Sequence, residues 1–214
     1  MHREIIVFAN SVKHGNSCVA GKCTLTGEWI RPVSDSTGSA ILEAQTKILN
    51  KRKGTKWPLK TLQKIGLNLS EHAPLANHQP ENYIITQEDQ WTDQYKISVE
   101  EAENYLDHPS DLWGEGGKVN YDSIKNQTVI INSSLYLVKL DKLELYKDLR
   151  EGEIKRRAKF LYNGISYDFA VTAREFDRLI GTRQEITLNN VIICTSLAEN
   201  YNGYCYKLIA SIIC

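Results

Sequence analysis

The sequence predicts a mainly β protein with a few helices, in which the strands form β-barrels. Two observations support this fold class. The second half of the chain consists largely of strand-like runs separated by turn residues, and Asn163-Gly164 joins two of these runs. Asn-Gly tolerates the two positive φ angles of a type I′ turn, so it is the strongest hairpin signal in the chain. With 214 residues, 42% of them hydrophobic, the chain is long enough for one large domain or two small ones.

The first half predicts four strands, one helix and one unusual loop. Runs of apolar and β-branched residues indicate strands at 3–10, 27–34, 62–70 and 83–85. Pro32 marks the second of these as an edge strand or a strand end. A helix is expected over 98–106, because Ser98 and Glu101 form a capping box. The segment SVKHGNSCVAGK, residues 11–22, is interpreted as a loop whose two glycines would let the backbone approach an anion.

The second half begins with a long strand, expected over 133–146, and continues into the Asn163-Gly164 hairpin. If Tyr162 and Ile165 flank the turn, alternation places several large apolar side chains on one face. The members of this aromatic face are Phe160, Tyr162, Ile165, Tyr167 and Phe169. Two interpretations stay open: the face packs a barrel core, or it is a platform on which nucleic-acid bases stack.

A helix follows the hairpin, because Thr172 and Glu175 fit a capping box and Gly181 suits the C′ position. Further strands are expected at 190–199 and 204–213. Three strands, a helix and two strands is the element order of a five-stranded OB-type barrel, a fold that commonly binds oligonucleotides or oligosaccharides. We place the boundary where periodicity is lost, which gives domains at 1–123 and 124–214.

The net charge is zero, but charge is distributed unevenly along the chain. Residues 44–70 contain seven basic residues and no acidic residue, whereas residues 71–123 contain twelve acidic residues and two lysines. The basic segment either binds a polyanion or is a solvated, lysine-rich loop that pairs with the acidic segment. In the predicted domain arrangement, both segments are insertions in the first barrel.

Composition also bears on location and on metal binding. The sequence lacks an apolar run of membrane-spanning length and a signal peptide, so we expect a cytoplasmic protein without a membrane partner. The five cysteines include no C-x-x-C pair and are expected to be free thiols. A metal site would use His14, Cys18 and Cys23 but lacks a recognisable fourth ligand, so we expect no metal and no cofactor.

Three groups of residues are candidates for ligand binding. In the motif EWIRPVS, alternation places Trp29 and Arg31 on one face, where an aromatic ring and a guanidinium suit a base and a phosphate. Alternatively, Trp29 lies at the edge of the core and Arg31 pairs with the acidic segment. In HQPENYII, the side chains at positions 79, 81 and 82 either contact base edges or hold a loop in place. Lys13 would supply charge in the 11–22 loop.

The sequence resembles the dual OB-fold (DuOB) domain family of prokaryotes. The resemblance rests on SVKHGNSCVAG, EWIRPVS, HQPENYII, DLWGEGG and YKLIASII, which occur in this order across nearly the whole chain. It implies two OB-like five-stranded barrels packed together, and a nucleic-acid or nucleotide sensing role in prokaryotic conflict systems. The positions in this chain that match the motifs are Lys13, Cys18, Gly21, Trp29, Arg31, Pro32, Gln79, Glu81, Asn82 and Trp113.

We therefore expect a non-catalytic module of antiviral defence that recognises nucleic acid, with a short single strand favoured, or a nucleotide-like ligand. The neutral charge and acidic middle segment argue against long duplexes. The expected binding residues are Lys13, Trp29, Arg31, Lys51, Arg52, Lys53, Gln79, Glu81, Asn82 and Trp113. The alternatives are a protein–protein adaptor that docks a partner effector through its acidic segment, and an enzyme that uses Cys18 as a nucleophile.

Overall fold

The computed structural model describes residues 1–13, 16–50, 53–75, 78–86, 91–150 and 152–214, and it leaves out the side chains at positions 12, 13 and 16. The chain divides into two compact units, Met1–Tyr105 and Leu106–Cys214. The expected boundary at residue 123 lies inside the second unit. The reason is a long-range pairing that periodicity does not reveal: β9 (Lys118–Asn120) pairs with the last strand of the chain.

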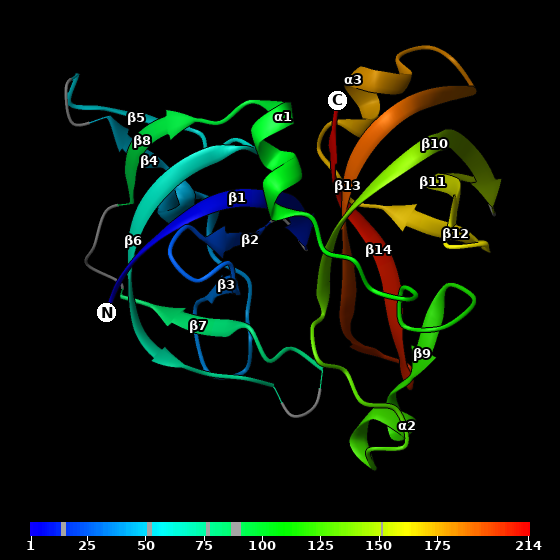
Figure 1. Cartoon of the computed structure of the whole chain (residues 1–214), viewed down its shortest axis with the longest axis horizontal. Coiled ribbons are helices and arrows are strands. Elements are labelled where there is room, and N and C mark those ends of the chain that lie inside the picture. The colour runs from blue at the N-terminus through cyan, green and yellow to red at the C-terminus, as the bar shows by residue number, and fades with distance from the viewer. Residues whose placement is uncertain (14–15, 51–52, 76–77, 87–90, 151) are drawn as a thin grey trace. The chain divides into compact units, whose positions relative to one another are not determined.

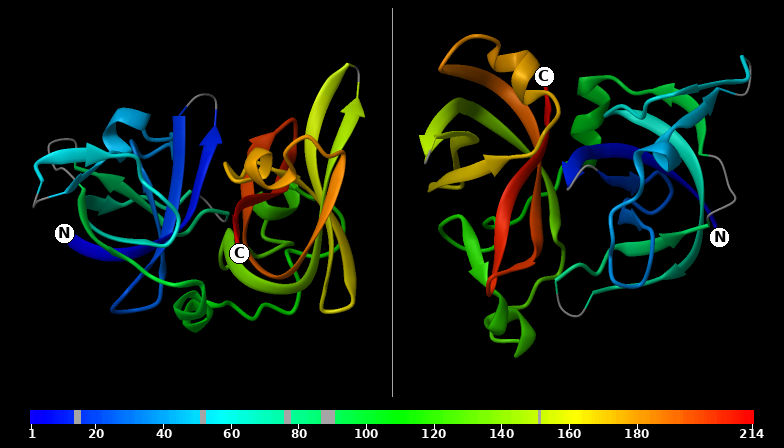
Figure 2. Two further views of the ribbon diagram at one scale, coloured as in Figure 1. Left: turned by 90° about the horizontal axis from the view of Figure 1, so that it is seen from above. Right: turned by 180° about the vertical axis from the view of Figure 1, so that it is seen from behind.

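The first unit is a closed five-stranded barrel, made of β1 (His2–Lys13), β2 (Asn16–Cys23), β3 (Trp29–Val33), β6 (Gln63–His72) and β7 (Asn82–Ile85). The strands follow the order β1-β2-β3-β7-β6, and β6 pairs with β1 to close the barrel. The pairing of β3 with β7 is parallel, whereas the other pairings of the barrel are antiparallel. This is the OB order for the first half of the chain, and the strong curvature of β1 and β6 that closes it is visible in Figure 1 and, from other sides, in Figure 2.

An insertion lies between the third and fourth barrel strands of this unit. It contains a 3-10 turn (Glu43–Thr46), β4 (Ile48–Asn50) and β5 (Thr55–Trp57). The strands β4 and β5 form a hairpin, and β4 pairs with β8 (Thr92–Lys96), which itself pairs with β6. These three strands lie together at one edge of the barrel (Figure 1). The basic segment therefore forms a strand hairpin rather than a plain loop.

The second unit repeats the same barrel order with longer strands. Its barrel strands are β10 (Leu135–Arg150), β11 (Glu153–Tyr162), β12 (Ile165–Val171), β13 (Glu185–Tyr201) and β14 (Tyr204–Ile213). They follow the order β11-β10-β13-β14, and β12 pairs with β11 and, in parallel, with β14. A short helix, α3 (Phe176–Ile180), lies between the third and fourth strands. The predicted mainly β fold of two five-stranded barrels is thus confirmed.

Each barrel has its own core. In the second barrel Phe160, Tyr167 and Phe169 are almost completely buried, and Tyr162 and Ile165 pack against the same cluster. The predicted hairpin is confirmed, since Tyr162 pairs with Ile165 and both turn residues have positive φ. The aromatic face therefore packs the core and is not a stacking platform. A separate cluster fills the first barrel, with Trp91 as its largest member.

Two local predictions are wrong. Residues 11–22 are not a loop, because Ser11–Lys13 continue β1 and Asn16 begins β2, which leaves only residues 14–15, outside the described part, between the strands. Glu175 is the N-cap residue of α3 but makes no side-chain cap bond. The Thr172 hydroxyl donates to the Ile209 carbonyl instead, because the chain at this point still follows β14. The helix is accordingly one turn shorter than expected.

The helix predicted after residue 97 does form. It comprises α1 (Val99–Ala102) and a 3-10 turn (Glu103–Tyr105), and the capping box between Ser98 and Glu101 is present. The remaining helix is α2 (Tyr121–Lys125). Among the described residues, every helix is too short to cross a lipid bilayer.

Candidate nucleic-acid interface

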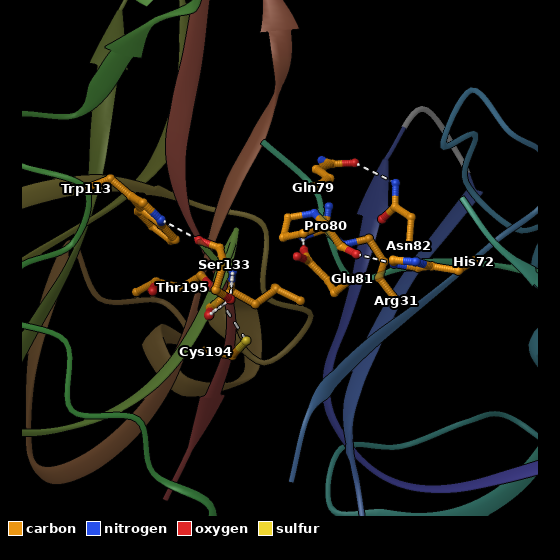
Figure 3. A network of polar contacts seen from close by, with 11 residues as sticks. Arg31, His72, Gln79, Pro80, Glu81, Asn82, Trp113, Ser133, Cys194 and Thr195 are labelled. Atoms are coloured by element: carbon orange, nitrogen blue, oxygen red, sulfur yellow. Dashed lines mark hydrogen bonds and ion pairs between the residues drawn. The ribbon is translucent and has the colours of Figure 1, made fainter. Parts of the chain in front are cut away.

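Arg31 and Glu81, two predicted binding residues, meet where β3 runs parallel to β7. The Arg31 backbone N–H donates to the Glu81 carbonyl at 2.8 Å, and Arg31 Nη2 lies 3.0 Å from Glu81 Oε1 (Figure 3). The exposed fractions of these side chains are 13% and 4%. Glu81 belongs to the acidic segment, so the geometry matches the alternative in which Arg31 pairs with that segment. A phosphate would have to compete with this buried carboxylate for the guanidinium.

Gln79, in the connection between β6 and β7, and Asn82, the first residue of β7, are both buried. Asn82 Nδ2 donates to Gln79 Oε1 at 3.2 Å, and the carbonyl of Pro80 lies 2.5 Å from His72 Nε2 (Figure 3). Asn82 Oδ1 is buried without a donor among the described residues. These side chains hold the connection together, as expected of Asn and Gln in Pro-broken turns. Contact with base edges would require the connection to open.

Trp29 is the first residue of β3, and it pairs with Lys22 on β2. Lys22 Nζ is 5.2 Å from the centroid of the indole ring, a cation–π distance, and it also donates to the carbonyl of Tyr105 at 2.7 Å. The edge of the Phe8 ring meets Trp29 at a centroid distance of 6.1 Å. Trp29 is therefore a half-buried residue at the core edge, with a buried lysine beside one face of its ring.

Of the predicted basic binding residues other than Arg31, the structure describes the side chain of Lys53 alone. Lys51 and Arg52 lie outside the described residues, and for Lys13 only the backbone is described, paired with Asn16. Lys53 is exposed, and its Nζ is 6.0 Å from the ring centroid of Trp57. Trp57 is 44% exposed and was not a predicted binding residue. The signal that points to it is its position as the single aromatic residue of the acid-free segment 44–70.

We use the name basic hairpin for β4, β5 and the lysines on and around them. Its exposed members are Lys47, Lys53, Lys56, Trp57 and Lys60. All three residues of β5 are exposed, whereas Ile48, which pairs with Trp57, points into the barrel core. The hairpin is thus attached to the barrel through Ile48 and through the pairing of β4 with β8, and it presents an indole ring and several lysines to solvent.

Trp113 has a structural environment in the second barrel. It adopts a positive φ of 58°, its ring stacks on Tyr136 at a centroid distance of 4.9 Å, and its Nε1 donates to the Ser133 carbonyl at 2.7 Å (Figure 3). It also packs against the cores of this unit. One ring face and the indole N–H are thus already used within the barrel.

The loop that follows Trp113 is fixed by a buried lysine. Lys207 is 1% exposed, and its Nζ donates to the carbonyls of Gly114 and Glu115 at 2.6 and 2.9 Å. Its backbone N–H donates to the Gly117 carbonyl. Burial lowers the pKa of the Lys207 ammonium to about 8, because desolvation disfavours the charged form. Lys207 therefore supports the Gly-rich loop through hydrogen bonds from its ammonium group and its backbone N–H.

The lowered pKa predicts that stability rises with pH just above pH 8. From pH 8 upward the folded chain loses the Lys207 proton, whereas the unfolded chain keeps it until about pH 10.5. The unfolded state then binds more protons, so the free energy of unfolding should increase by about 1 kcal/mol between pH 8 and 9. Urea unfolding of the wild type and of Lys207→Met measures this difference, and the variant should lack the increase.

The rise in stability with pH should end near pH 9 because of Cys205, which lies two residues before Lys207 on β14. Burial raises the pKa of the Cys205 thiol from 9.0 to about 11, so above pH 9 the folded chain keeps a thiol proton that the unfolded chain loses, and this opposing contribution cancels the further rise from Lys207. The comparison is therefore made in a Cys205→Ala background as well. An equal slope in the wild type and in Lys207→Met would contradict the assignment.

Cys18 is the nucleophile of the alternative enzymatic interpretation. It lies on β2 opposite Ser11 and is half-buried, while His14 lies outside the described residues. Cys23, Cys194 and Cys205 are buried free thiols. In the described part of the chain, no three His, Cys, Asp or Glu side chains are grouped as metal ligands would be.

A family-model comparison agrees with this architecture. The model of the dual OB-containing domain family matches residues 3–212. No curated protein matches the sequence. Among solved structures, the chain is similar to one described as "Crystal structure of the tetrameric p202 HIN2", with 9% identity and a TM-score of 0.31, over 98% of this chain and 94% of that chain. Because the family match covers nearly the whole sequence, which folds into two OB-type barrels, the chain belongs to the dual OB-containing domain family.

Proposed function

We propose that this chain is a non-catalytic recognition module for nucleic acid, with a short single strand as the favoured ligand. The observation that carries the proposal is the basic hairpin, in which the exposed indole ring of Trp57 lies 6.0 Å from Lys53 Nζ and further exposed lysines are close to it in sequence. Proteins that bind single strands combine positive charge along the backbone with aromatic side chains on which bases stack. Both components are present on one hairpin of the first barrel.

The charge distribution favours a short ligand. The four exposed lysines of the basic hairpin supply a local positive field, whereas the chain as a whole is neutral and its 71–123 segment is strongly acidic. A long duplex would extend beyond the positive region and meet repulsion, because backbone phosphates dominate affinity. A short strand or a nucleotide-like ligand needs only the hairpin. Membership of a family associated with prokaryotic conflict systems supports a role in antiviral defence.

The proposal assigns different roles to the residues of the EWIRPVS and HQPENYII motifs and to the basic hairpin. Glu81, Gln79 and Asn82 are buried, and the Arg31 side chain is 13% exposed. The Arg31–Glu81 ion pair links β3 to the residue before β7, and the Asn82–Gln79 hydrogen bond holds the start of β7, so these contacts help to fix β3 against β7. Trp57 and the lysines of the basic hairpin are exposed and contribute little to the core. Substitutions in the hairpin should therefore change binding without changing stability, and substitutions in the buried group should do the reverse.

The test is fluorescence anisotropy of labelled single-stranded DNA, single-stranded RNA and duplex, titrated with the purified chain over a salt series. We expect saturable binding of single strands that weakens with salt. Trp57→Ala should reduce affinity about tenfold through lost base stacking. Lys56→Gln with Lys60→Gln should lower the salt slope by roughly one unit for each phosphate contact removed.

Lys142→Gln is the matched control, because this exposed lysine lies on β10 of the other barrel. It should leave both affinity and slope unchanged. Flat titrations with every oligonucleotide at low salt would contradict the proposal. They would favour the adaptor function, in which the acidic segment docks a basic partner protein, and retention of such a partner would then be measured by pull-down.

A further inference from the structure

A second group of exposed aromatic residues lies at the turn between β13 and β14. We use the name tyrosine–lysine patch for Lys118, Tyr201, Tyr204 and Tyr206. Tyr201 and Tyr204 are cross-strand partners that flank the Asn202-Gly203 turn, and Tyr206 pairs with Lys118 on β9. Figure 1 shows β9 beside the beginning of β14. Three strands of the second unit therefore contribute to one surface.

Strand alternation directs these tyrosines away from the core. Cys205 and Lys207, which alternate with Tyr204 and Tyr206 along β14, are 0% and 1% exposed. Tyr201 and Tyr206 are 66% and 38% exposed. Two large aromatic rings thus face solvent, whereas the residues on either side of Tyr206 along β14 are buried. Core packing does not explain their identity, and exposed aromatic groups of this kind are informative about binding.

The rings and the ammonium group are close enough to act together. Lys118 Nζ lies 3.4 Å from the ring centroid of Tyr204 and 5.9 Å from that of Tyr206. The ring centroids of Tyr201 and Tyr206 are 6.4 Å apart, with an interplanar angle of 55°. The patch therefore offers ring faces for more than one base and a cation at the same place for the phosphate between bases.

We propose that the tyrosine–lysine patch is a base-stacking site for single-stranded nucleic acid. Tyr201 and Tyr206 stack on unpaired bases, and Lys118 contacts the phosphate backbone while Tyr204 holds its ammonium in position. The ligand is single-stranded because bases in a duplex hide their faces, whereas splayed bases expose them to aromatic side chains. The turn between the fourth and fifth strands is also a position at which OB barrels bind oligonucleotides. This inference rests on the proposed function and adds a contact in the second barrel.

The experiment measures the affinity of two labelled probes of the same length, about 12 nucleotides, for the whole chain and its variants. One probe is oligothymidylate and the other is an abasic strand with the same phosphates. For the wild type, removal of the bases should weaken binding. In Tyr201→Ala with Tyr206→Ala, oligothymidylate affinity should fall about tenfold or more, and removal of the bases should then have a smaller effect, because the stacking partner is already lost.

Conservative and control variants separate stacking from other effects. Tyr206→Phe keeps the ring and should retain wild-type affinity, and Lys118→Gln should weaken binding of both probes alike. Leu161→Ala removes a side chain of the same barrel that is 63% exposed and should change neither affinity. Melting temperatures of all variants should match the wild type, because the substituted groups lie outside the core.

The outcomes distinguish this inference from the proposed function. Wild-type binding that Trp57→Ala weakens but the double tyrosine variant does not would overturn the tyrosine–lysine patch and leave the basic hairpin in place. Absence of binding to every oligonucleotide would overturn both. If the double tyrosine variant loses a bound protein while oligonucleotide affinity is unchanged, the patch belongs to a protein partner and the inference is wrong.

Discussion

Arg31→Ala should lower the free energy of unfolding by about 3 kcal/mol, because it leaves the Glu81 carboxylate buried without its counter-charge. Glu81 is 4% exposed and lies 3.0 Å from the guanidinium, so water cannot readily replace the lost partner. The backbone bond from Arg31 to Glu81 should survive, since alanine keeps its N–H. Urea unfolding followed by circular dichroism measures the loss.

Two further variants test the cause of that loss. Arg31→Met combined with Glu81→Leu removes both charges and should recover most of the stability, because an apolar pair of similar size avoids the desolvation penalty. Arg150→Ala removes an arginine that is 63% exposed and paired with Asp148, and it should cost less than about 1 kcal/mol. An Arg31→Ala variant that unfolds like the wild type but loses oligonucleotide binding would instead make Arg31 a phosphate-binding residue.

Gly21→Ala should destabilise the first barrel by about 3 kcal/mol or more, because the new methyl group has no space. A Cβ at this position would lie 2.3 Å from the Ile6 carbonyl oxygen and 2.9 Å from its carbonyl carbon. Both atoms belong to the backbone of β1, so relief requires the strand pairing itself to move. The β2 strand has a neighbour on each side here, since Gly21 pairs with Val7 on β1 and with Ile30 on β3.

Gly117→Ala is the matched control for this substitution. A Cβ at Gly117 would meet the Asp168 carbonyl oxygen at 3.5 Å, an ordinary van der Waals contact, and the residue is exposed. We expect a change of less than about 1 kcal/mol. Similar losses for the two variants would contradict the close approach of β2 to β1 as the cause of the effect at Gly21.

The second barrel could be predicted from the sequence because its signals are local. The Asn163-Gly164 dipeptide specifies the hairpin through the φ angles of these two residues alone. The alternation of core-facing side chains from Phe160 to Phe169 then follows from the position of the turn. Even there, one local pattern failed. Thr172 and Glu175 fit a capping box, yet the Thr172 hydroxyl bonds to Ile209, 37 positions away, because strand pairing continues past the end of β12.

The first barrel was less predictable because its key interactions are distant in sequence. Residues 11–22 contain two glycines, a histidine and two lysines, which are typical of a loop, but the pairing of β1 with β2 makes most of them strand. Gly21 is needed because of Ile6 on the neighbouring strand, and not because of a turn. Arg31 finds its counter-charge on Glu81, across a parallel pairing that no short pattern encodes.

Local patterns of the sequence by themselves determined the strand-rich class, the hairpin and the order of elements in the second barrel, since turn chemistry and side-chain alternation act over a few residues. Only the tertiary structure decided which side chains reach solvent. Barrel closure buries Gln79 and Asn82 and leaves the Arg31 side chain only 13% exposed, although sequence reasoning placed all three in a binding site. It leaves Trp57, Tyr201 and Tyr206 exposed, which that reasoning passed over. The physical reason is that exposure depends on which strands become neighbours, and those neighbours lie tens of residues apart along the chain.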